Sequence, residues 1–277
     1  MAQRTHKSRS KSSSANTVRI GQQLPDAEEI CDQRPAEIEI WKEALFGAEL
    51  LLLLASPVYY GLGLPHGNGS AVVLIPGFLG SDHYLAQMHT WLERIGYRPY
   101  VSGIRLNAEC PNLLIRSRLD ATIEAALQES GGKVHLIGHS LGGVIARSIA
   151  GQRPRDIASV ITLGSPFRGT IAHKSVLRAA EIVRRQILDK HGSSVLPECY
   201  TSHCTCNFIE SLRSRIHKSI LQTAIYTMDD GVVDWRCCRT EDPERDFLVP
   251  GTHIGLAFNA SVYAVIAQRL AEACTEP

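Results

Sequence analysis

Apolar residues along this chain gather in short continuous runs, and most runs precede a stretch in which apolar positions recur every three or four residues. The runs are typical of strands buried on both faces of a parallel sheet, and the stretches are typical of amphipathic helices. The predicted strands occupy residues 71–75, 98–101, 133–137, 158–163, 223–227 and 247–249. Pro99 cannot donate to a ladder, so the strand at 98–101 is predicted at a sheet edge.

Predicted helices separate these strands. They cover residues 37–56, 113–128, 176–188 and 208–220, with others beginning near residue 81, directly after residue 140 and shortly before residue 262. The alternation predicts an α/β fold in which a mostly parallel sheet of about six strands carries helices on both faces.

The alternation is interrupted at two places. Residues 1–36 are first basic and serine-rich, then acidic with two prolines, and are predicted to form a disordered tail. Residues 37–277 are predicted to form one domain, within which residues 170–219 are an insertion. Ligands of such folds bind at the carboxyl edge of the sheet, so we expect the insertion to act as a cap or lid there.

The predicted helix at 37–56 is apolar on every side over residues 50–54. We expect it either to dock against the domain or to contact a membrane or lipid through residues 44–56. Its apolar part is too short to span about 30 Å of hydrocarbon. Residues 1–17 lack a secretory signal, so a cytoplasmic protein without a transmembrane helix is expected, with membrane association only at the surface.

Composition excludes several classes of function. The formal net charge of +1 over 277 residues gives no indication of a nucleic-acid partner. No G-x-G-x-x-G sequence opens a predicted helix, so no nucleotide site is expected. No cofactor or metal is predicted.

The main candidate for chemistry is Gly138-His-Ser-Leu-Gly142, a G-x-S-x-G sequence between a predicted strand and a predicted helix. This context is that of a nucleophile elbow, in which a sharp turn exposes a serine. Flanking glycines suit such a turn because they have no Cβ to clash and tolerate positive φ. Ser140 is therefore the predicted nucleophile, and a serine in a purely structural turn is the alternative.

A serine nucleophile needs a base, and the base needs an orienting acid. In this topology the acid and then the base follow the serine along the chain, each after a strand. Asp229, Asp230 and Asp234 follow the fifth predicted strand, and Asp230 is favoured because Gly231 permits a tight turn. His253, in a glycine-flanked loop after the last strand, is the predicted base.

The oxyanion of an acyl-transfer reaction needs preorganised N–H donors. The predicted donors are the backbone N–H groups of Leu141, which follows the nucleophile, and of Phe78, in the loop after the first strand. The Phe78 ring is expected to line an acyl pocket or to belong to the core. His139 is expected to support the elbow structurally, because neighbouring side chains on a turn point apart.

The chain contains eight cysteines, three of which (Cys199, Cys204 and Cys206) cluster in the insertion. Their spacing departs from the C-x₂₋₄-C pairs that zinc prefers. A disulfide between the insertion and Cys237 or Cys238 is one alternative, although a reducing cytoplasm opposes it. Buried free thiols are the other.

Four motifs together resemble the α/β-hydrolase superfamily: Pro76-Gly-Phe78, the Ser140 motif, Asp230-Gly-Val-Val233 and Gly251-Thr-His-Ile-Gly-Leu256. The likeness is greatest to lipase-like serine esterases, including small bacterial lipases, and covers residues 69–273. The resemblance implies an α/β-hydrolase fold, a triad of Ser140, Asp230 and His253, and an oxyanion hole formed by Phe78 and Leu141.

The predicted function is hydrolysis of carboxylic esters through an acyl-enzyme intermediate, with an ester or lipid small molecule as substrate. An acyltransferase that uses the same triad is one alternative. A non-catalytic binding protein on a hydrolase scaffold is another.

Overall fold

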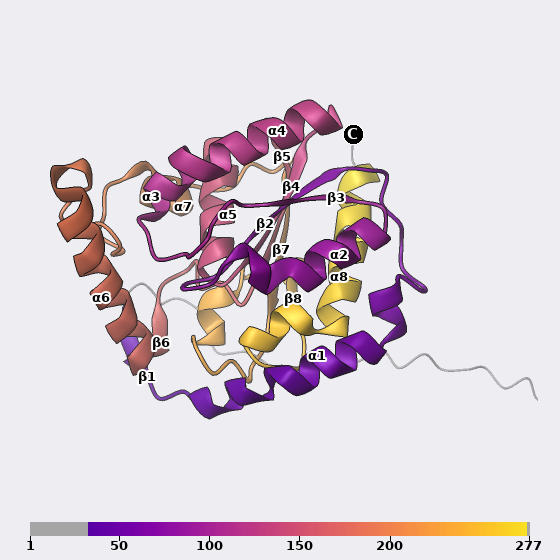
Figure 1. The fold of residues 1–277 in the computed structure, drawn as a ribbon, viewed down its shortest axis with the longest axis horizontal. Helices are drawn as coiled ribbons and strands as arrows, with labels where there is room; N and C mark the ends of the chain where they lie inside the picture. Colours follow the sequence, from indigo (N-terminus) through magenta and orange to yellow (C-terminus); the bar gives the residue numbers. More distant parts are fainter. Residues whose placement is uncertain (1–32, 276–277) are drawn as a thin grey trace, which may run out of the picture.

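The computed structural model describes residues 33–275 (Figure 1). The strands are β1 (Arg34–Ala36), β2 (Ala71–Ile75), β3 (Arg98–Val101), β4 (Val134–His139), β5 (Ile157–Leu163), β6 (Ile171–His173), β7 (Leu221–Tyr226) and β8 (Asp246–Leu248). The α-helices are α1 (Phe46–Ala55), α2 (Ala86–Arg94), α3 (Pro111–Leu114), α4 (Asp120–Ser130), α5 (Leu141–Gln152), α6 (Lys174–His191), α7 (Asn207–Arg213) and α8 (Ala260–Thr275).

The main sheet has six strands in the order β3-β2-β4-β5-β7-β8, and every neighbouring pair is parallel. Helices α4 and α5 cover one face, and α2 and α8 cover the other (Figure 1). All residues of β2 and β4 are buried, which explains why they form continuous runs in the sequence. The predicted fold class is confirmed, and β3 lies at the edge where its proline placed it.

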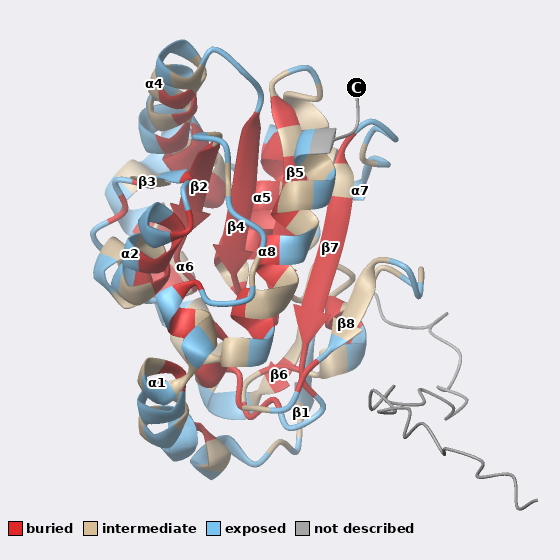
Figure 2. Cartoon of the chain, turned by 90° about the vertical axis from the view of Figure 1, so that its right-hand side faces the viewer, coloured by how far each residue is buried: buried red, intermediate tan, exposed pale blue. Residues whose placement is uncertain are grey.

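The carboxyl ends of the central strands meet at one edge of the sheet. His139 of β4 pairs with Leu163 of β5, and Leu163 pairs with Ile225 of β7. The arrows of β4 and β7 point towards the end of the molecule where α1, β1 and β6 lie (Figure 2). Loops that follow these strands are therefore neighbours in space although they are distant in the sequence.

Two predicted boundaries were wrong. Residues 1–32 of the predicted tail lie outside the described residues, but Arg34–Ala36 form β1 and pair in parallel with β6. Proline at position 35 fixes only φ and lacks an N–H donor, and edge strands tolerate both, so it is compatible with this short pairing. The helix predicted at 208–220 ends at Arg213, because Ser214 is extended and its hydroxyl donates to the Ser211 carbonyl.

The segment predicted as a helix at 37–56 begins as a 3₁₀ helix over Ile40–Leu45 and continues as α1. It docks against the domain: Leu53 is fully buried in the core that α2 and α8 share, and Leu50 and Leu54 pack on its margin. In the part of the chain that the structure describes, no helix has both the length and the apolar character needed to cross a membrane.

Trp91 anchors the core on the α8 side of the sheet. It is fully buried, its ring lies 4.5 Å from that of Tyr263, and its indole N–H donates to the Val58 carbonyl. We expect Trp91→Ala to lower the free energy of unfolding by about 3–5 kcal/mol, because it leaves a large cavity. Trp41→Ala, at a position that is 64% exposed, should change it by less than about 0.5 kcal/mol. Urea denaturation measures both, and equal losses would contradict this description of the core.

Candidate active site

Ser140 lies at a sharp turn between β4 and α5. Its backbone has φ 51° and ψ −122°, a region that residues with a Cβ rarely adopt. The neighbouring glycines have ordinary φ values and are needed for space instead. A Cβ at Gly138 would overlap the backbone of Gly143, and one at Gly142 would overlap the Ile75 carbonyl. The strain is therefore concentrated on the serine, and the glycines allow the helix to approach the sheet.

Of the three candidate acids, the structure brings Asp230 against His253. Asp230 Oδ2 accepts a hydrogen bond from His253 Nδ1 over 2.6 Å, and both side chains are buried. Asp230 Oδ1 accepts from the backbone N–H groups of Val232 and Val233 at 2.9 and 2.7 Å. These three bonds leave the carboxylate fixed and fully partnered.

The other two acids have different partners. Asp229 is exposed and forms an ion pair with Lys42, and Asp234 accepts from the backbone N–H of Arg236. Neither of them bonds the imidazole of His253 in the part of the chain that the structure describes.

The environment of His253 favours its protonated form. Burial alone would lower the pKa of this imidazole, but the Asp230 carboxylate and then Glu43 raise it, and the net result lies above the ordinary value. Nδ1 donates to Asp230, so Nε2 is the nitrogen that remains to accept a proton.

Ser140 and His253 line the same cavity. Among the hydrogen bonds of the described residues, none joins Ser140 Oγ to His253. Such bonds are often long in a free enzyme and shorten when substrate binds.

His139 supports the His253 loop (residues 251–255) as well as the elbow. Its Nε2 donates to the His253 carbonyl over 2.9 Å, and the two rings lie 4.9 Å apart. Burial, and then the nearby His253, lower the pKa of His139 to about 3, so it is neutral at physiological pH. A neutral ring that donates through Nε2 is a structural support, in agreement with its position beside the turn.

The backbone N–H groups predicted to hold the oxyanion have no hydrogen-bond partner among the described residues. Neither the Phe78 N–H nor the Leu141 N–H donates a hydrogen bond within residues 33–275, although the next residue, Leu79, donates to the Asn107 carbonyl. Leu141 is the first residue of α5, where N–H groups lack partners within the helix.

Asn107 holds the loop that carries Phe78, and nothing in the sequence identified it. It is fully buried, its side-chain amide donates to the Pro76 carbonyl over 2.8 Å, and its backbone bonds Leu79 and Gly80. The sequence also gives no indication of Glu43 and Glu49, because a carboxylate in a predicted docking helix has no local pattern that links it to a distant loop. Their buried contacts to the His253 loop are described below.

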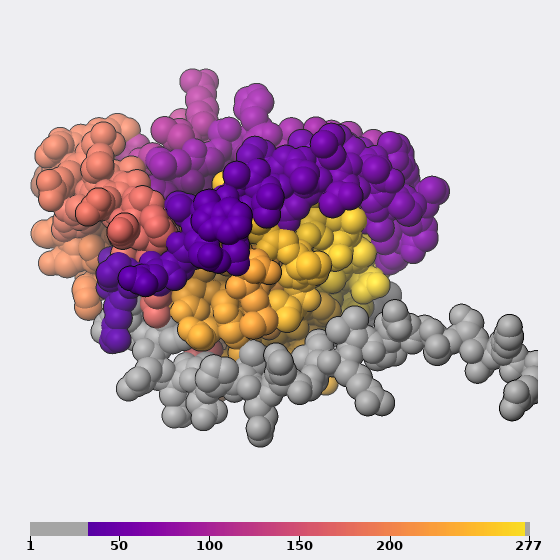
Figure 3. All heavy atoms as spheres, turned by 90° about the horizontal axis from the view of Figure 1, so that it is seen from below, coloured from indigo at the N-terminus to yellow at the C-terminus, as the bar shows by residue number. Residues whose placement is uncertain are grey.

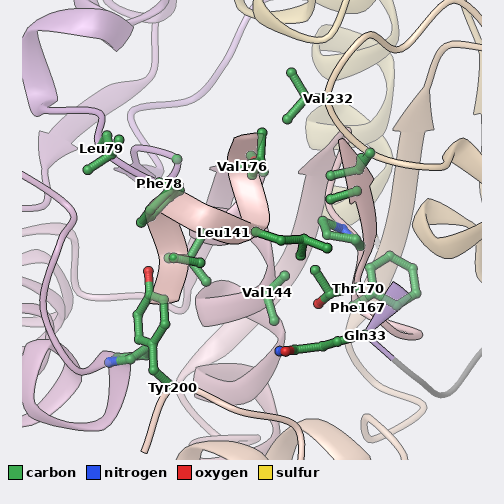
Figure 4. A pocket seen from close by; sticks show the side chains of 18 of the residues that line it. Gln33, Phe78, Leu79, Leu141, Val144, Phe167, Thr170, Val176, Tyr200 and Val232 are labelled. Atoms are coloured by element: carbon green, nitrogen blue, oxygen red, sulfur yellow. The ribbon is translucent and has the colours of Figure 1, made fainter. Parts of the chain in front are cut away.

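A cavity of about 1020 Å³ opens in front of Ser140. Apolar and aromatic side chains from α5, the oxyanion loop and the insertion surround it (Figure 4). They include Phe78, Leu141, Val144, Val176 and Tyr200, and the loop after β5 adds Phe167. Phe78, whose backbone N–H is a predicted oxyanion donor, also forms a wall of the cavity, with its ring 6.2 Å from that of Tyr200.

The described cysteines are free thiols. Cys199 of the insertion packs with Cys110, whereas Cys237 and Cys238 lie near β6 and β7 in a separate part of the core. Of the two alternatives, the bridge between the insertion and Cys237 or Cys238 is therefore absent among the described residues, and the free thiols are present. Within the described residues, no group of His, Cys, Asp and Glu side chains is arranged to hold a metal ion.

A family model described as palmitoyl protein thioesterase matches residues 71–227, more than half of the chain. This chain belongs to the palmitoyl protein thioesterase family. The matched span runs from the start of β2 to the residue after β7 and includes Ser140. Asp230 and His253 lie beyond it.

Triacylglycerol lipases resemble parts of this thioesterase-family chain. A triacylglycerol lipase of Burkholderia plantarii is 32% identical over 135 residues, which cover 46% of this chain and 37% of the lipase. One from Pseudarthrobacter phenanthrenivorans is 33% identical over 108 residues, 36% of this chain and 34% of the lipase. The chain thus spans about a third of the length of the curated relatives it matches.

Solved structures support the fold of this family member. A metagenome-derived lipolytic enzyme superposes with a TM-score of 0.51 at 15% identity, covering 77% of this chain and 96% of its own. The monoglyceride lipase of Saccharomyces cerevisiae gives 0.50 at 15% identity, covering 76% and 90%. Both likenesses concern the α/β-hydrolase fold.

The strain at Ser140 has a measurable consequence. Ser140→Gly and Ser140→Ala both remove the hydroxyl, but only glycine accepts this backbone conformation without strain. We expect the glycine variant to be the more stable by about 1 kcal/mol, after allowing for the greater flexibility of glycine in the unfolded chain. Urea unfolding of the two proteins measures the difference, and a more stable alanine variant would refute the strained turn.

Proposed function

We propose that this protein hydrolyses acyl esters of lipids, with Ser140 as nucleophile, His253 as general base and Asp230 as the acid that orients the base. The observation that carries this proposal is the buried hydrogen bond between Asp230 and His253 beside the cavity that exposes Ser140. The lipase relatives and the thioesterase family match support the same chemistry.

In the proposed reaction, His253 Nε2 takes the Ser140 proton as the serine oxygen bonds to the ester carbonyl carbon. The carbonyl oxygen becomes an anion and accepts hydrogen bonds from the Phe78 and Leu141 N–H groups. Collapse of this intermediate breaks the bond to the leaving alcohol, which receives the proton from His253. Water then gives a proton to His253, attacks the acyl-enzyme and releases the carboxylic acid, and the proton returns to Ser140.

The cavity indicates the kind of acyl group. Its apolar walls suit a long hydrocarbon chain, and insertion residues such as Val176, Leu177 and Tyr200 form part of them. We assign residues 170–219 the role of a cap that covers this chain. An acyl thioester is a second candidate substrate, because the family that the chain matches is that of palmitoyl protein thioesterases.

An ester series from p-nitrophenyl acetate to palmitate, run beside S-palmitoyl N-acetylcysteamine, tests the proposal. We expect kcat/KM to rise with chain length, and Ser140→Ala to lower turnover about 10⁶-fold. A fluorophosphonate probe should label the wild type and leave Ser140→Ala unlabelled. Absence of turnover on every substrate, or equal labelling of the variant, would refute a serine hydrolase.

The N-terminal segment, residues 40–62, carries exposed apolar side chains, and we therefore assign it a contact with lipid surfaces. They are Trp41, Leu45, Leu51, Leu52, Tyr60 and Leu62, which range from 52% to 71% exposed. Figure 3 shows this segment on the surface, lying across the C-terminal part of the chain. Phe46 belongs to the same segment and lines the cavity, so a lipid surface docked here would lie near the substrate's route.

Leu51→Ser combined with Leu52→Ser tests this contact. We expect the double variant to lose most of its flotation with phosphatidylcholine vesicles, because two apolar side chains no longer enter the lipid, and to keep its turnover of short esters. Val101→Ser, at an exposed apolar position of β3, is the matched control and should float like the wild type. Unchanged flotation of the double variant would contradict the proposed surface.

A further inference from the structure

A buried carboxylate from the N-terminal segment joins the two loops that carry Asp230 and His253. Glu43, in the 3₁₀ helix over Ile40–Leu45, is only 6% exposed. Its Oε1 accepts from the backbone N–H groups of Gly231 at 2.8 Å and His253 at 3.0 Å, and its Oε2 accepts from that of Ile254 at 2.7 Å. One side chain thus partners the residue after the acid, the base itself and the residue after the base.

A second glutamate continues this support along the His253 loop. Glu49 of α1 accepts from the Thr252 N–H at 2.9 Å and from the Thr252 hydroxyl at 2.6 Å. The Thr252 hydroxyl in turn accepts from the Gly255 N–H at 3.0 Å. Hydrogen bonds to a carboxylate are stronger than neutral ones, and an N–H left without a partner in a buried loop is costly.

The glycines of both motifs make room for these carboxylates. A Cβ at Gly231 would lie 2.6 Å from Glu43 Oε1, and one at Gly251 would lie 2.5 Å from Glu49 Oε1. A Cβ at Gly255 would overlap Glu49 Oε2. Gly231 therefore serves to admit a side chain from another segment, and its φ is not in the left-handed region. Each of these glutamate carboxylates therefore occupies space that a side chain at the neighbouring glycine would fill.

We propose that Glu43 is a positioning residue for the acid–base pair, holding the Asp230 and His253 loops in register and placing a second anion beside the imidazole, with Glu49 fixing the residue before His253. This inference rests on the proposed roles of Asp230 and His253. It assigns the N-terminal segment a part in the chemistry, in addition to its docking role.

The charged and titratable groups around His253 show how Glu43 affects the pKa of the imidazole. Asp230 and Glu43 are the carboxylates that raise the pKa of the imidazole, against the effect of burial. His139 packs on the ring and is neutral because burial lowers its pKa, and Tyr84 keeps its proton because burial raises its pKa. Glu49 bonds Thr252, the residue before His253. Removing the Glu43 charge should therefore leave the imidazole easier to deprotonate.

Three substitutions in the full chain separate positioning from simple structural support. Glu43→Gln keeps the size but removes the charge and turns an amide towards a backbone N–H, so kcat should fall roughly 10- to 100-fold with KM little changed. The acid limb of its pH–kcat/KM profile should move to lower pH. Glu43→Asp withdraws the carboxylate but keeps the charge, so kcat should fall while the acid limb stays close to that of the wild type. Glu39→Gln, on an exposed carboxylate of the same segment, is the control and should match the wild type.

The expected pattern is a moved acid limb in Glu43→Gln alone, together with wild-type thermal unfolding of Glu39→Gln. Unchanged kcat in either Glu43 variant, or an unmoved limb in Glu43→Gln, would overturn the proposal. If Glu43→Gln does not fold, the kcat of Glu43→Asp tests the proposal: a lowered kcat supports it and an unchanged kcat overturns it. NMR titration of the His253 imidazole in each folded variant compares its pKa with that of the wild type and needs no turnover. Failure of the ester-hydrolase proposal would be recognised separately, because the wild type itself would then be inactive and unlabelled by the fluorophosphonate.

Discussion

The hydrogen bond between Asp230 and His253, 2.6 Å long and closed off from solvent, is the contact on which the candidate site depends. The bond forms only if the loop after β7, which carries Asp230, meets the loop after β8, which carries His253. Because β7 and β8 pair in parallel, both strands end at the same edge of the sheet. Removing two polar side chains from water is unfavourable unless their other hydrogen-bonding groups are also satisfied. The structure meets this condition with backbone N–H groups on Asp230 and with His139 and Glu43 around the imidazole loop.

Much of this arrangement could be predicted from sequence because it follows local patterns. Buried strands appear as continuous apolar runs, and Ser140, Asp230 and His253 each follow such a run, so a parallel sheet brings them to the same edge. The choice of Asp230 over Asp229 and Asp234 rested on the glycine beside it. The structure brings the same residue to His253, although the glycine is there to admit Glu43.

Other parts could not be predicted, because no local pattern encodes them. Glu43 precedes Gly231 by 188 residues and His253 by 210, and its segment has the composition of an apolar docking helix. Asn107 supports the oxyanion loop from an irregular connection that has no periodicity. Arg34–Ala36 form a strand only because β6 offers a partner edge, which a local reading of a proline-containing segment does not reveal.

The N-terminal segment lies between solvent and the His253 loop. Leucines and a tryptophan face solvent along it, Leu53 fixes it to the core, and two carboxylates on its inner side hold the His253 loop. Glu43 bonds the backbone of His253 itself, so the position of the imidazole depends on the position of this segment. One structural element therefore presents apolar side chains to solvent, lines the cavity through Phe46 and bonds the His253 loop.

The central claim is that Ser140, His253 and the backbone N–H groups of Phe78 and Leu141 act on one reacting carbonyl. A crystal structure of the protein after reaction with a fluorophosphonate tests it most directly. We expect phosphorus bonded to Ser140 Oγ, its oxygen within hydrogen-bonding distance of the Phe78 and Leu141 nitrogens, and His253 Nε2 turned towards the serine oxygen. An adduct on another residue, or a phosphoryl oxygen that points away from both nitrogens, would contradict the account.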